Sequence, residues 1–305
     1  MNRIEFLSYA KLNLFLEVIR KMEDGYHEIF TLFQTISLAD KIIVEKTDRE
    51  NEIVFKNIDI PLDENNTVQK VIELLKIKKG IKIIIEKNIP VGAGLGGGSS
   101  NAGALLLALN NFLELNLSFD KLWTLSRKIG ADVPFFLFGG TAIGLNRGDI
   151  IVPVKPLEKK VFMLKTPDIK VSTKMIYQNL TEYGDKSKIY AYFLSENFNN
   201  FYNRLEQNSF ILYPILGEIK EKMSEFCDFV LMSGSGSTIF GGFEDRETAE
   251  KYLNGMEEVS LFDAIDRDTY YKNSGASPSG KASVFGADIR RFESSRPNSE
   301  KRGDL

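Results

Sequence analysis

The sequence predicts a two-domain α/β protein in which strands and helices are mixed along the chain. Three observations support this fold class. Apolar residues recur with a period of two in some segments and at helical spacing in others. The order strand, glycine loop, strand, helix, strand closes the second half of the chain. With 305 residues, 43% of them apolar and 27% charged, the chain is long enough for two ordinary globular domains.

Strands dominate the structure expected for the first 90 residues. Alternate residues from 12 to 18 are aliphatic, which indicates a strand with one buried face. The pair Asp24-Gly25 is typical of a turn. Further short strands are expected at 29–33, 40–46 and 52–57, and a β-branched inner strand at 81–86.

Helices are expected between and after these strands. Apolar residues recur at helical spacing over 67–77, and residues 102–113 are strong helix formers. Ser118 can cap another helix that ends at Gly130. Pro134 suits the first turn of a short helix, because its missing N–H has no helical partner there.

A second region starts near residue 160 and has a different order of elements. It opens with a strand at 161–165, and Ser172 is expected to cap a helix. Two more helices are expected within 187–226. The remaining elements are strands at 228–232 and 238–243, which flank a glycine loop at 233–237, then a helix at 245–256 and a strand at 258–266. This order predicts a ferredoxin-like α+β layer.

Charge and cysteine content exclude several classes of protein. The formal net charge of −3, from 39 basic and 42 acidic side chains, gives no electrostatic reason to expect nucleic acid or an anionic membrane as a partner. Cys227 is the sole cysteine and His27 the sole histidine, so an intramolecular disulfide and a Cys/His metal site are excluded. Residues 1–10 lack a signal-peptide pattern, and no apolar run is long enough for a membrane span. We therefore expect a cytoplasmic protein.

Residues 273–305 differ in composition from the rest of the chain. The run N-S-G-A-S-P-S-G-K-A-S is typical of a flexible linker, and the residues after it show almost no apolar periodicity. We expect a disordered or artificially appended tail. A native functional extension is the alternative interpretation.

Residues 90–100, with the sequence P-V-G-A-G-L-G-G-G-S-S, form the strongest functional motif; we call them the phosphate loop. They follow an expected strand and open an expected helix. The glycines remove Cβ atoms, so backbone N–H groups can converge on an anion, and the helix N-terminus adds positive charge. The loop lacks the Gly-Lys-Ser/Thr of a Walker A motif and the acidic residue that supports a dinucleotide fingerprint. A flexible linker is the alternative.

Five motifs resemble those of the GHMP kinases, a superfamily of small-molecule kinases. They are A-K-L-N-L at 10–14, G-Y-H-E at 25–28, the phosphate loop, G-A-D-V-P-F-F at 130–136 and G-S-G-S-T at 234–238. They occur in the order that the family has, and they span most of the chain. Three of them have the form seen in the diphosphocytidyl-methylerythritol kinases.

The resemblance implies an ATP-dependent phosphotransferase with Lys11 and Asp132 as its catalytic pair. Asp132 would accept the proton of the attacking hydroxyl group. Lys11 would orient that hydroxyl and offset charge in the transition state. The alternatives are an N-cap role for Asp132 at the short helix and an ordinary solvated lysine at position 11.

The resemblance also assigns ATP to the phosphate loop, with Asn66 in contact with adenine. Magnesium is expected to accompany ATP because it bridges phosphate oxygens, and Ser100 is a candidate ligand. The residues expected to bind ATP are Asn66, Pro90, Val91, Gly92, Ala93, Gly94, Leu95, Gly96, Gly97, Gly98, Ser99 and Ser100.

A cytidyl small molecule is the acceptor that the resemblance implies. Tyr26 would stack on the cytosine and His27 would bond to it. Asn13 would contact the erythritol part, and Lys87 and Thr173 are further expected substrate contacts. Surface positions for these side chains are the alternative. The loop at 234–238 would support the substrate pocket, or form a simple tight turn.

The family implies a domain over 1–155 like domain 2 of ribosomal protein S5 and a ferredoxin-like domain over 156–272, with ATP in the cleft between them. The implied reaction phosphorylates the 2-hydroxyl of the cytidyl substrate, in non-mevalonate isoprenoid synthesis. The protein would act as a monomer or weak homodimer. The alternatives are a GHMP kinase for mevalonate, homoserine or a sugar, and a non-catalytic nucleotide-binding regulator of the same fold.

Overall fold

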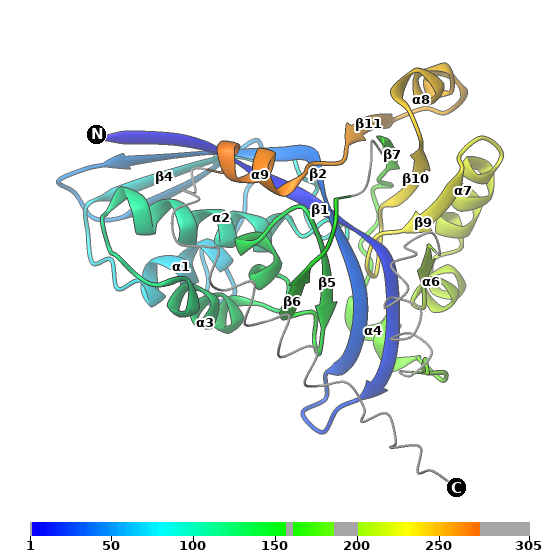
Figure 1. The fold of residues 1–305 in the computed structure, drawn as a ribbon, viewed down its shortest axis with the longest axis horizontal. Coiled ribbons are helices and arrows are strands. Elements are labelled where there is room, and N and C mark those ends of the chain that lie inside the picture. The colour runs from blue at the N-terminus through cyan, green and yellow to red at the C-terminus, as the bar shows by residue number, and fades with distance from the viewer. Residues whose placement is uncertain (1, 157–160, 186–200, 275–305) are drawn as a thin grey trace, which may run out of the picture.

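The structure is a computed structural model that describes residues 2–156, 161–185 and 201–274. It is a mixed α/β molecule with two sheets that lie beside each other, as the sequence predicts (Figure 1). In the described residues the larger sheet has seven strands and the smaller sheet has four. None of the described helices is long and apolar enough to cross a lipid bilayer.

Two long antiparallel strands form the spine of the molecule. Strand β1 (Arg3–Lys21) and strand β2 (His27–Lys46) are joined by the predicted turn at Asp24-Gly25. The prediction of one buried face for β1 is wrong, because Asn13 and Glu17 are buried as well. Helix α2 packs against β1, and the second half of β1 packs against the smaller sheet, so residues 8–18 are buried on both faces.

Strand β2 is continuous, whereas the sequence pattern predicts separate strands at 29–33 and 40–46. The register against β1 shifts between Tyr9 and Lys11, where residues 36–38 of β2 form an irregularity. Such a bulge interrupts the alternation of side chains without ending the strand. A search for period two therefore divides the strand at the bulge.

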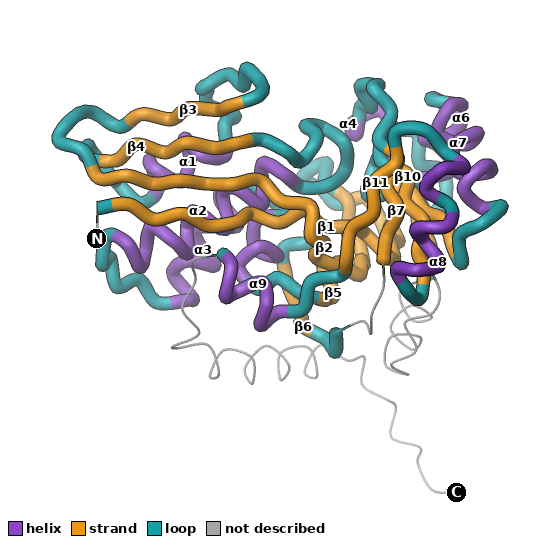
Figure 2. Tube along the Cα trace, turned by 90° about the horizontal axis from the view of Figure 1, so that it is seen from above, coloured by secondary structure: helices purple, strands orange, loops and turns teal. Residues whose placement is uncertain are grey.

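The larger sheet has the strand order β3-β4-β2-β1-β8, and β5 and β6 extend it beside β2. The other strands are β3 (Glu52–Lys56), β4 (Ile81–Glu86), β5 (Thr141–Leu145), β6 (Ile150–Pro153) and β8 (Tyr202–Asn203). Helices cover one face of this sheet, as Figure 2 shows for α1 (Thr67–Leu74), α2 (Gly97–Phe112) and α3 (Phe119–Ile129). The short 3-10 helix η1 (Val133–Leu137) follows α3. Strands β5, β6 and β8 are absent from the prediction.

The smaller sheet is antiparallel, with the order β11-β7-β10-β9. Its strands are β7 (Val161–Lys165), β9 (Phe229–Met232), β10 (Ile239–Phe243) and β11 (Val259–Asp263), which lie close to the predicted segments. Its helices are α4 (Thr173–Gln178), α6 (Glu206–Leu212), α7 (Pro214–Ser224), α8 (Arg246–Lys251) and the 3-10 turn η2 (Leu253–Gly255). Residues 187–200 of the predicted helical region lie outside the described residues.

The last described helix, α9 (Arg267–Asn273), returns to the first half of the chain (Figure 1). Tyr270 and Tyr271 are buried in the core that α2 and η1 share, and Asn273 donates to the Tyr9 hydroxyl at 2.8 Å. Residues 273 and 274, which the sequence assigned to the tail, therefore belong to the fold. The rest of the predicted tail, 275–305, lies outside the described residues.

Candidate active site

The phosphate loop connects β4 to α2 through three glycines in the left-handed region. Gly92, Gly94 and Gly96 have φ values of 73°, 78° and 71°. Other residues are strained in this conformation, so the glycine pattern has a backbone cause. Helix α2 starts at Gly97, earlier than the predicted residue 102, and its first amides therefore face the loop. This backbone conformation suits an anion, and the role of the segment as a phosphate cradle stays a prediction.

A cavity of about 350 Å³ adjoins this loop; we call it the loop cavity. Apolar side chains line one part of it and the main chain of the loop lines the other. Asn66 lies in its wall, where its side chain caps α1 by accepting from the amides of Val68 and Gln69 at 3.0 and 3.2 Å. Its amide also donates to the Pro61 carbonyl at 2.9 Å. The cap positions Asn66 firmly, and its contact with adenine stays a prediction.

Lys11 and Asp132 face each other across a short gap. The Lys11 Nζ lies 3.9 Å from a carboxylate oxygen of Asp132, and it donates to the carbonyl of Gly94 at 2.8 Å. Lys11 is only 3% exposed, and this burial lowers its pKa, while the negative charge of Asp132 acts in the opposite direction. Within the described residues, Asp132 makes no side-chain capping bond to η1, which argues against the N-cap alternative. The pair that the sequence predicts is therefore assembled.

A chain of hydrogen bonds sets the orientation of Asn13 beside Lys11. The Thr31 hydroxyl donates to the Phe15 carbonyl at 2.7 Å, so its oxygen must accept from the Asn13 amide at 2.8 Å. The Asn13 Oδ1 then points to the Lys11 ammonium at 2.6 Å. Sequence reasoning missed Thr31, because only the pairing of β1 with β2 brings it to this position.

A cavity of about 1070 Å³, which we call the large cavity, opens on the other side of the pair. The predicted catalytic and substrate residues that line it are Lys11, Asn13, Tyr26, His27, Asp132 and Thr173. Aromatic and cationic side chains that the sequence analysis missed complete its wall, namely Lys21, Arg147, Lys174, Tyr177 and Tyr183. The structure therefore brings most of the predicted substrate residues together.

Aromatic rings gather at one end of the large cavity. The rings of His27 and Tyr177 are 4.9 Å apart, and Tyr183 stacks on His27 at 6.3 Å. The guanidinium of Arg147 lies 4.2 Å above the ring of Tyr26. Burial lowers the pKa of His27 and raises the pKa of Tyr177. The end of the cavity can therefore hold a flat heterocycle beside a neutral imidazole.

Lys87 does not occupy the predicted place. It lines the loop cavity, and the described lining of the large cavity does not include it. Its ammonium forms a buried ion pair with Asp40 and a bond of 3.2 Å to Asn101. Lys87 directly follows strand β4 and lies on the side of the loop cavity, so this geometry does not support its predicted contact with the acceptor, which stays a prediction.

Ser100, unlike Lys87, is not part of the described lining of the loop cavity. Its hydroxyl is fully buried, 2.6 Å from the Tyr9 carbonyl and 2.7 Å from the Ser8 hydroxyl. This position does not support its role as a magnesium ligand, which stays a prediction. Among the described residues there is also no group of three or more His, Cys, Asp or Glu side chains that could hold a metal ion.

The second glycine loop, 233–237, packs directly on the phosphate loop. The Ser233 hydroxyl donates to the Gly94 carbonyl at 2.9 Å, and the Thr238 amide donates to the Ala93 carbonyl at 3.2 Å. A Cβ atom at Gly94 would collide with the carbonyl of Ser233. The Ser235 hydroxyl lies 2.7 Å from the hydroxyl of Thr173, so this loop supports both cavities.

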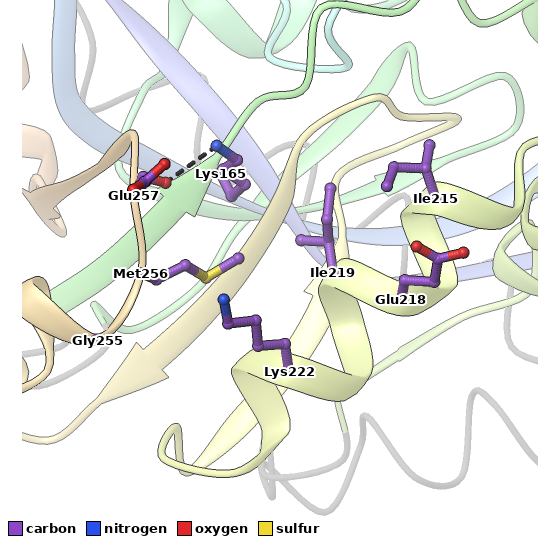
Figure 3. Close-up of a pocket in the computed structure, with 8 residues that line it drawn as sticks. All are labelled: Lys165, Ile215, Glu218, Ile219, Lys222, Gly255, Met256 and Glu257. Carbon is purple, nitrogen blue, oxygen red and sulfur yellow. Dashed lines mark hydrogen bonds between the residues drawn. The ribbon is translucent and has the colours of Figure 1, made fainter.

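A separate groove of about 500 Å³ lies between α7 and the segment before β11 (Figure 3). Lys222 and Glu218 of α7 border it opposite Met256, and Lys165 donates to the Glu257 carbonyl at 3.0 Å. Within the described residues it contains none of the predicted site residues. The candidate active site is therefore the pair of cavities that share Gly92, Gly94 and Gly96 in their walls, with Lys11 and Asp132 in the wall of the large cavity.

Comparison with known proteins agrees with this site. The GHMP kinases N terminal domain matches residues 66–140, and the GHMP kinases C terminal domain matches residues 191–259. The 4-diphosphocytidyl-2-C-methyl-D-erythritol kinase of Thermodesulfovibrio yellowstonii is 38% identical over 82% of this chain and 93% of its own. The kinase of the same name from Caldicellulosiruptor bescii is 39% identical over 84% of this chain and 93% of its own.

Solved structures give the same result. A crystal structure of 4-(cytidine 5'-diphospho)-2C-methyl-D-erythritol kinase superposes with a TM-score of 0.70 at 34% identity, over 86% of this chain and 99% of that one. Homoserine kinase from Cytophaga hutchinsonii has a TM-score of 0.65 at 18% identity, over 87% and 95% of the two chains, and shows the shared fold alone.

The matched domains and a phosphate loop beside a lysine–aspartate pair define a small-molecule kinase of the GHMP type. The curated relatives narrow this class. The chain belongs to the GHMP kinases and, within them, to the family of 4-diphosphocytidyl-2-C-methyl-D-erythritol kinases.

Proposed function

We propose that this chain transfers the γ-phosphoryl group of ATP to the 2-hydroxyl of 4-diphosphocytidyl-2-C-methyl-D-erythritol. One observation carries the proposal: the two cavities share the glycines at 92, 94 and 96 in their walls. A triphosphate held by the loop would therefore end beside Lys11 and Asp132. An alcohol in the large cavity would meet it at that junction.

ATP occupies the loop cavity in this proposal. The side chains of Phe55, Ile60 and Val91 offer apolar surface to the adenine ring. The amides of the phosphate loop and of the first turn of α2 offer donors to the phosphates, and the helix dipole adds to the attraction. This division matches the two chemical halves of the nucleotide.

The reaction forms a bond between the acceptor oxygen and the γ-phosphorus and breaks the bond from that phosphorus to the β,γ-bridging oxygen. Asp132, whose side chain is 35% exposed, accepts the hydroxyl proton. The Lys11 ammonium offsets negative charge on the oxygens of the phosphoryl group during its transfer, and its bond to the Gly94 carbonyl keeps it beside the loop.

The acceptor lies in the large cavity with its base at the aromatic end. Tyr26 and Tyr177 supply ring faces for stacking, and His27 supplies a polar edge. The cationic side chains of Lys21, Arg147 and Lys174 match the negative charge of a diphosphate. These features favour a cytidyl diphosphate over a small uncharged sugar.

Magnesium enters with ATP as part of the substrate complex, because it neutralises the β- and γ-phosphates. Ser100 is turned inward, and the described residues offer no acidic cluster for a resident ion. The chain's own contribution is therefore to hold the phosphates.

A substrate panel with a coupled assay for ADP release tests the proposal. Turnover with the cytidyl compound and none with mevalonate or homoserine is expected. Turnover of mevalonate alone would point to another GHMP kinase, and ATP binding without any turnover would point to a regulator. The role in isoprenoid synthesis depends on the acceptor that this assay identifies. The cytoplasmic location and the monomeric or weakly dimeric state stay predictions.

A further inference from the structure

A buried carboxylate lies beneath the phosphate loop. Asp40 of β2 is 0% exposed and accepts four hydrogen bonds. One oxygen accepts from the amides of Asn88 and Ile89 at 2.7 and 2.8 Å. The other accepts from the Lys87 ammonium and from the Asn101 side chain at 2.8 Å. The donors belong to the chain segments immediately before and after the loop's glycines, so one carboxylate ties both ends together.

A second layer of bonds ties the start of α2 to β1. The Asn101 amide group donates to the Ser8 hydroxyl at 2.9 Å, and Ser8 and Ser100 share a bond of 2.7 Å. The Ser100 hydroxyl donates to the Tyr9 carbonyl. Because β1 also carries Lys11, the network sets the helix start relative to the catalytic lysine.

The chemistry of this network suits anion binding above it. A buried carboxylate beside a triphosphate would repel it, but the ammonium of Lys87 offsets that charge. A Cβ atom at Gly97 would lie 3.2 Å from the Lys87 Nζ, so the ammonium reaches the floor of the loop. Burying such a pair is costly, and well-packed apolar residues often stabilise a fold as much. Its presence here indicates a role in local geometry.

We propose that Asp40 is a positioning residue for ATP, whose carboxylate holds the two ends of the phosphate loop so that the loop amides converge on the triphosphate. This inference rests on the proposed function, because it takes ATP to be the ligand of the loop. Asp40 does not touch the nucleotide. Its effect is transmitted through residues 87–89 and Asn101. A loop that is already ordered before ATP binds loses less binding free energy to ordering.

The test compares ATP dissociation constants of variants by calorimetry. Asp40→Asn keeps the size of the side chain but places an amide donor against donors. ATP should bind about 10- to 100-fold more weakly, since charge-assisted bonds are lost. At saturating ATP the KM for the acceptor should change by less than about two-fold, because neither Asp40 nor the residues that donate to it line the large cavity.

A second variant keeps the inference testable if Asp40→Asn does not fold. Asn101→Ala removes the side-chain bonds of Asn101 to Asp40, Ser8 and Lys87 and leaves the bonds of Asp40 to Lys87 and to the two amides. It should weaken ATP binding by about 3- to 10-fold, as expected for the loss of one uncharged side chain from the network. Its melting temperature reports on folding separately.

Asp149→Asn is the matched control. Asp149 is also buried, at 6% exposure, and it accepts from the Asn146 side chain at 2.8 Å and from Arg127 at 2.7 Å. It holds the turn between β5 and β6, away from the loop cavity. The variant should lose stability, yet bind ATP within about two-fold of the unaltered chain.

The outcomes separate the two proposals. Folded Asp40→Asn and Asn101→Ala variants that bind ATP as the unaltered chain does would overturn the inference and leave the proposed function standing. An equal loss of ATP affinity in Asp149→Asn would also overturn it, since the effect would then follow from lost stability. If the unaltered chain binds no ATP, the proposed function fails and the inference fails with it.

Discussion

The two cavities are built by different means. The loop cavity uses the main chain of one continuous segment, residues 90–100, on a floor of buried polar side chains. The large cavity uses side chains from β1, β2, α4, the turn at 147 and the second glycine loop. Main-chain donors suit the phosphates that many substrates share, whereas side chains suit one acceptor. In the proposed function, the main chain therefore holds the phosphates of ATP, and a few exchangeable side chains select the acceptor.

This difference implies two kinds of response to substitution. A change in the loop cavity should act through backbone strain and should affect ATP and stability together. A change in the large cavity should remove one contact and should affect the acceptor alone. Residues at the junction should affect the rate itself.

The largest effect is expected at the junction. Asp132→Ala removes the base and should lower turnover by about 10²–10⁴-fold while ATP binds nearly as before. Steady-state kinetics and ATP calorimetry measure both quantities. Asp132→Asn keeps the shape and should be almost as slow. Near-normal turnover in either variant would remove Asp132 from the mechanism.

Gly94→Ala should have the next largest effect. Its φ of 78° strains any other residue, and its Cβ would collide with the second glycine loop. We expect a loss of about 2–5 kcal/mol in the free energy of unfolding, with weaker ATP binding. Gly92→Ala is the matched control, since its φ is 73° and a Cβ there meets nothing within 4 Å.

The control should lose only about 1–2 kcal/mol, because backbone strain acts there without a clash. Denaturant unfolding of the two variants measures the difference. Equal losses would mean that contact between the two glycine loops does not matter for stability.

Removing one ring from the large cavity should affect the acceptor alone. Tyr177→Ala and Tyr26→Ala should each weaken acceptor binding by about 1–3 kcal/mol, which is typical of one lost base-stacking contact. The KM for the acceptor and the dissociation constant for ATP separate the two cavities. A change in ATP affinity of the same size would contradict their independence.

Thr31→Val should have a smaller effect on the rate. It removes the bonds that orient Asn13, so the Lys11 ammonium loses a fixed acceptor, worth about 1 kcal/mol. Turnover should fall by about 3- to 10-fold. Burial already lowers the pKa of Lys11, so the activity should also decline at a lower alkaline pH than before. Thr31→Ser should restore both properties, and an unchanged pH profile in Thr31→Val would contradict this role.

The smallest effect concerns acid pH. Burial lowers the pKa of His27 from its ordinary value of about 6.5, so the imidazole is neutral at pH 7. Acceptor affinity should be constant above about pH 6.5 and should fall only once the pH drops below this lowered pKa. Because the pKa of His27 is lower in the folded protein than in the unfolded chain, the neutral imidazole contributes to stability above the unfolded pKa. This contribution is lost as the pH falls through the folded pKa. His27→Gln should remove the acid dependence of the KM; if the dependence persists, another group is responsible.

Local patterns were sufficient for several elements of the fold. The helix that Ser118 caps, the strand Val161–Lys165 and the helix that Ser172 caps lie where the sequence predicts them. Each depends on side-chain alternation or on a hydrogen bond to a residue within one turn. Helix α9 could not be predicted in this way, because its two tyrosines matter only through the distant core that they enter.

The features of the candidate site can also be separated into those that were expected from the sequence and those that depend on tertiary contacts. The phosphate loop follows from its glycine pattern, and the Lys11–Asp132 pair was expected from the resemblance to the GHMP kinases. The ion pair of Lys87 with Asp40 and the inward orientation of the Ser100 hydroxyl could not be predicted, since both depend on which face of a strand or helix meets the core.

The sequence by itself determined where the backbone can turn, where helices begin and which segment can hold phosphate, because glycine conformations and capping bonds act over a few residues. Only the tertiary structure decided that Tyr177 stands beside His27, that Thr31 orients Asn13 and that Asp40 lies beneath the loop. These contacts join segments far apart in the chain. Their geometry comes from strand register and helix packing, and no local pattern records it.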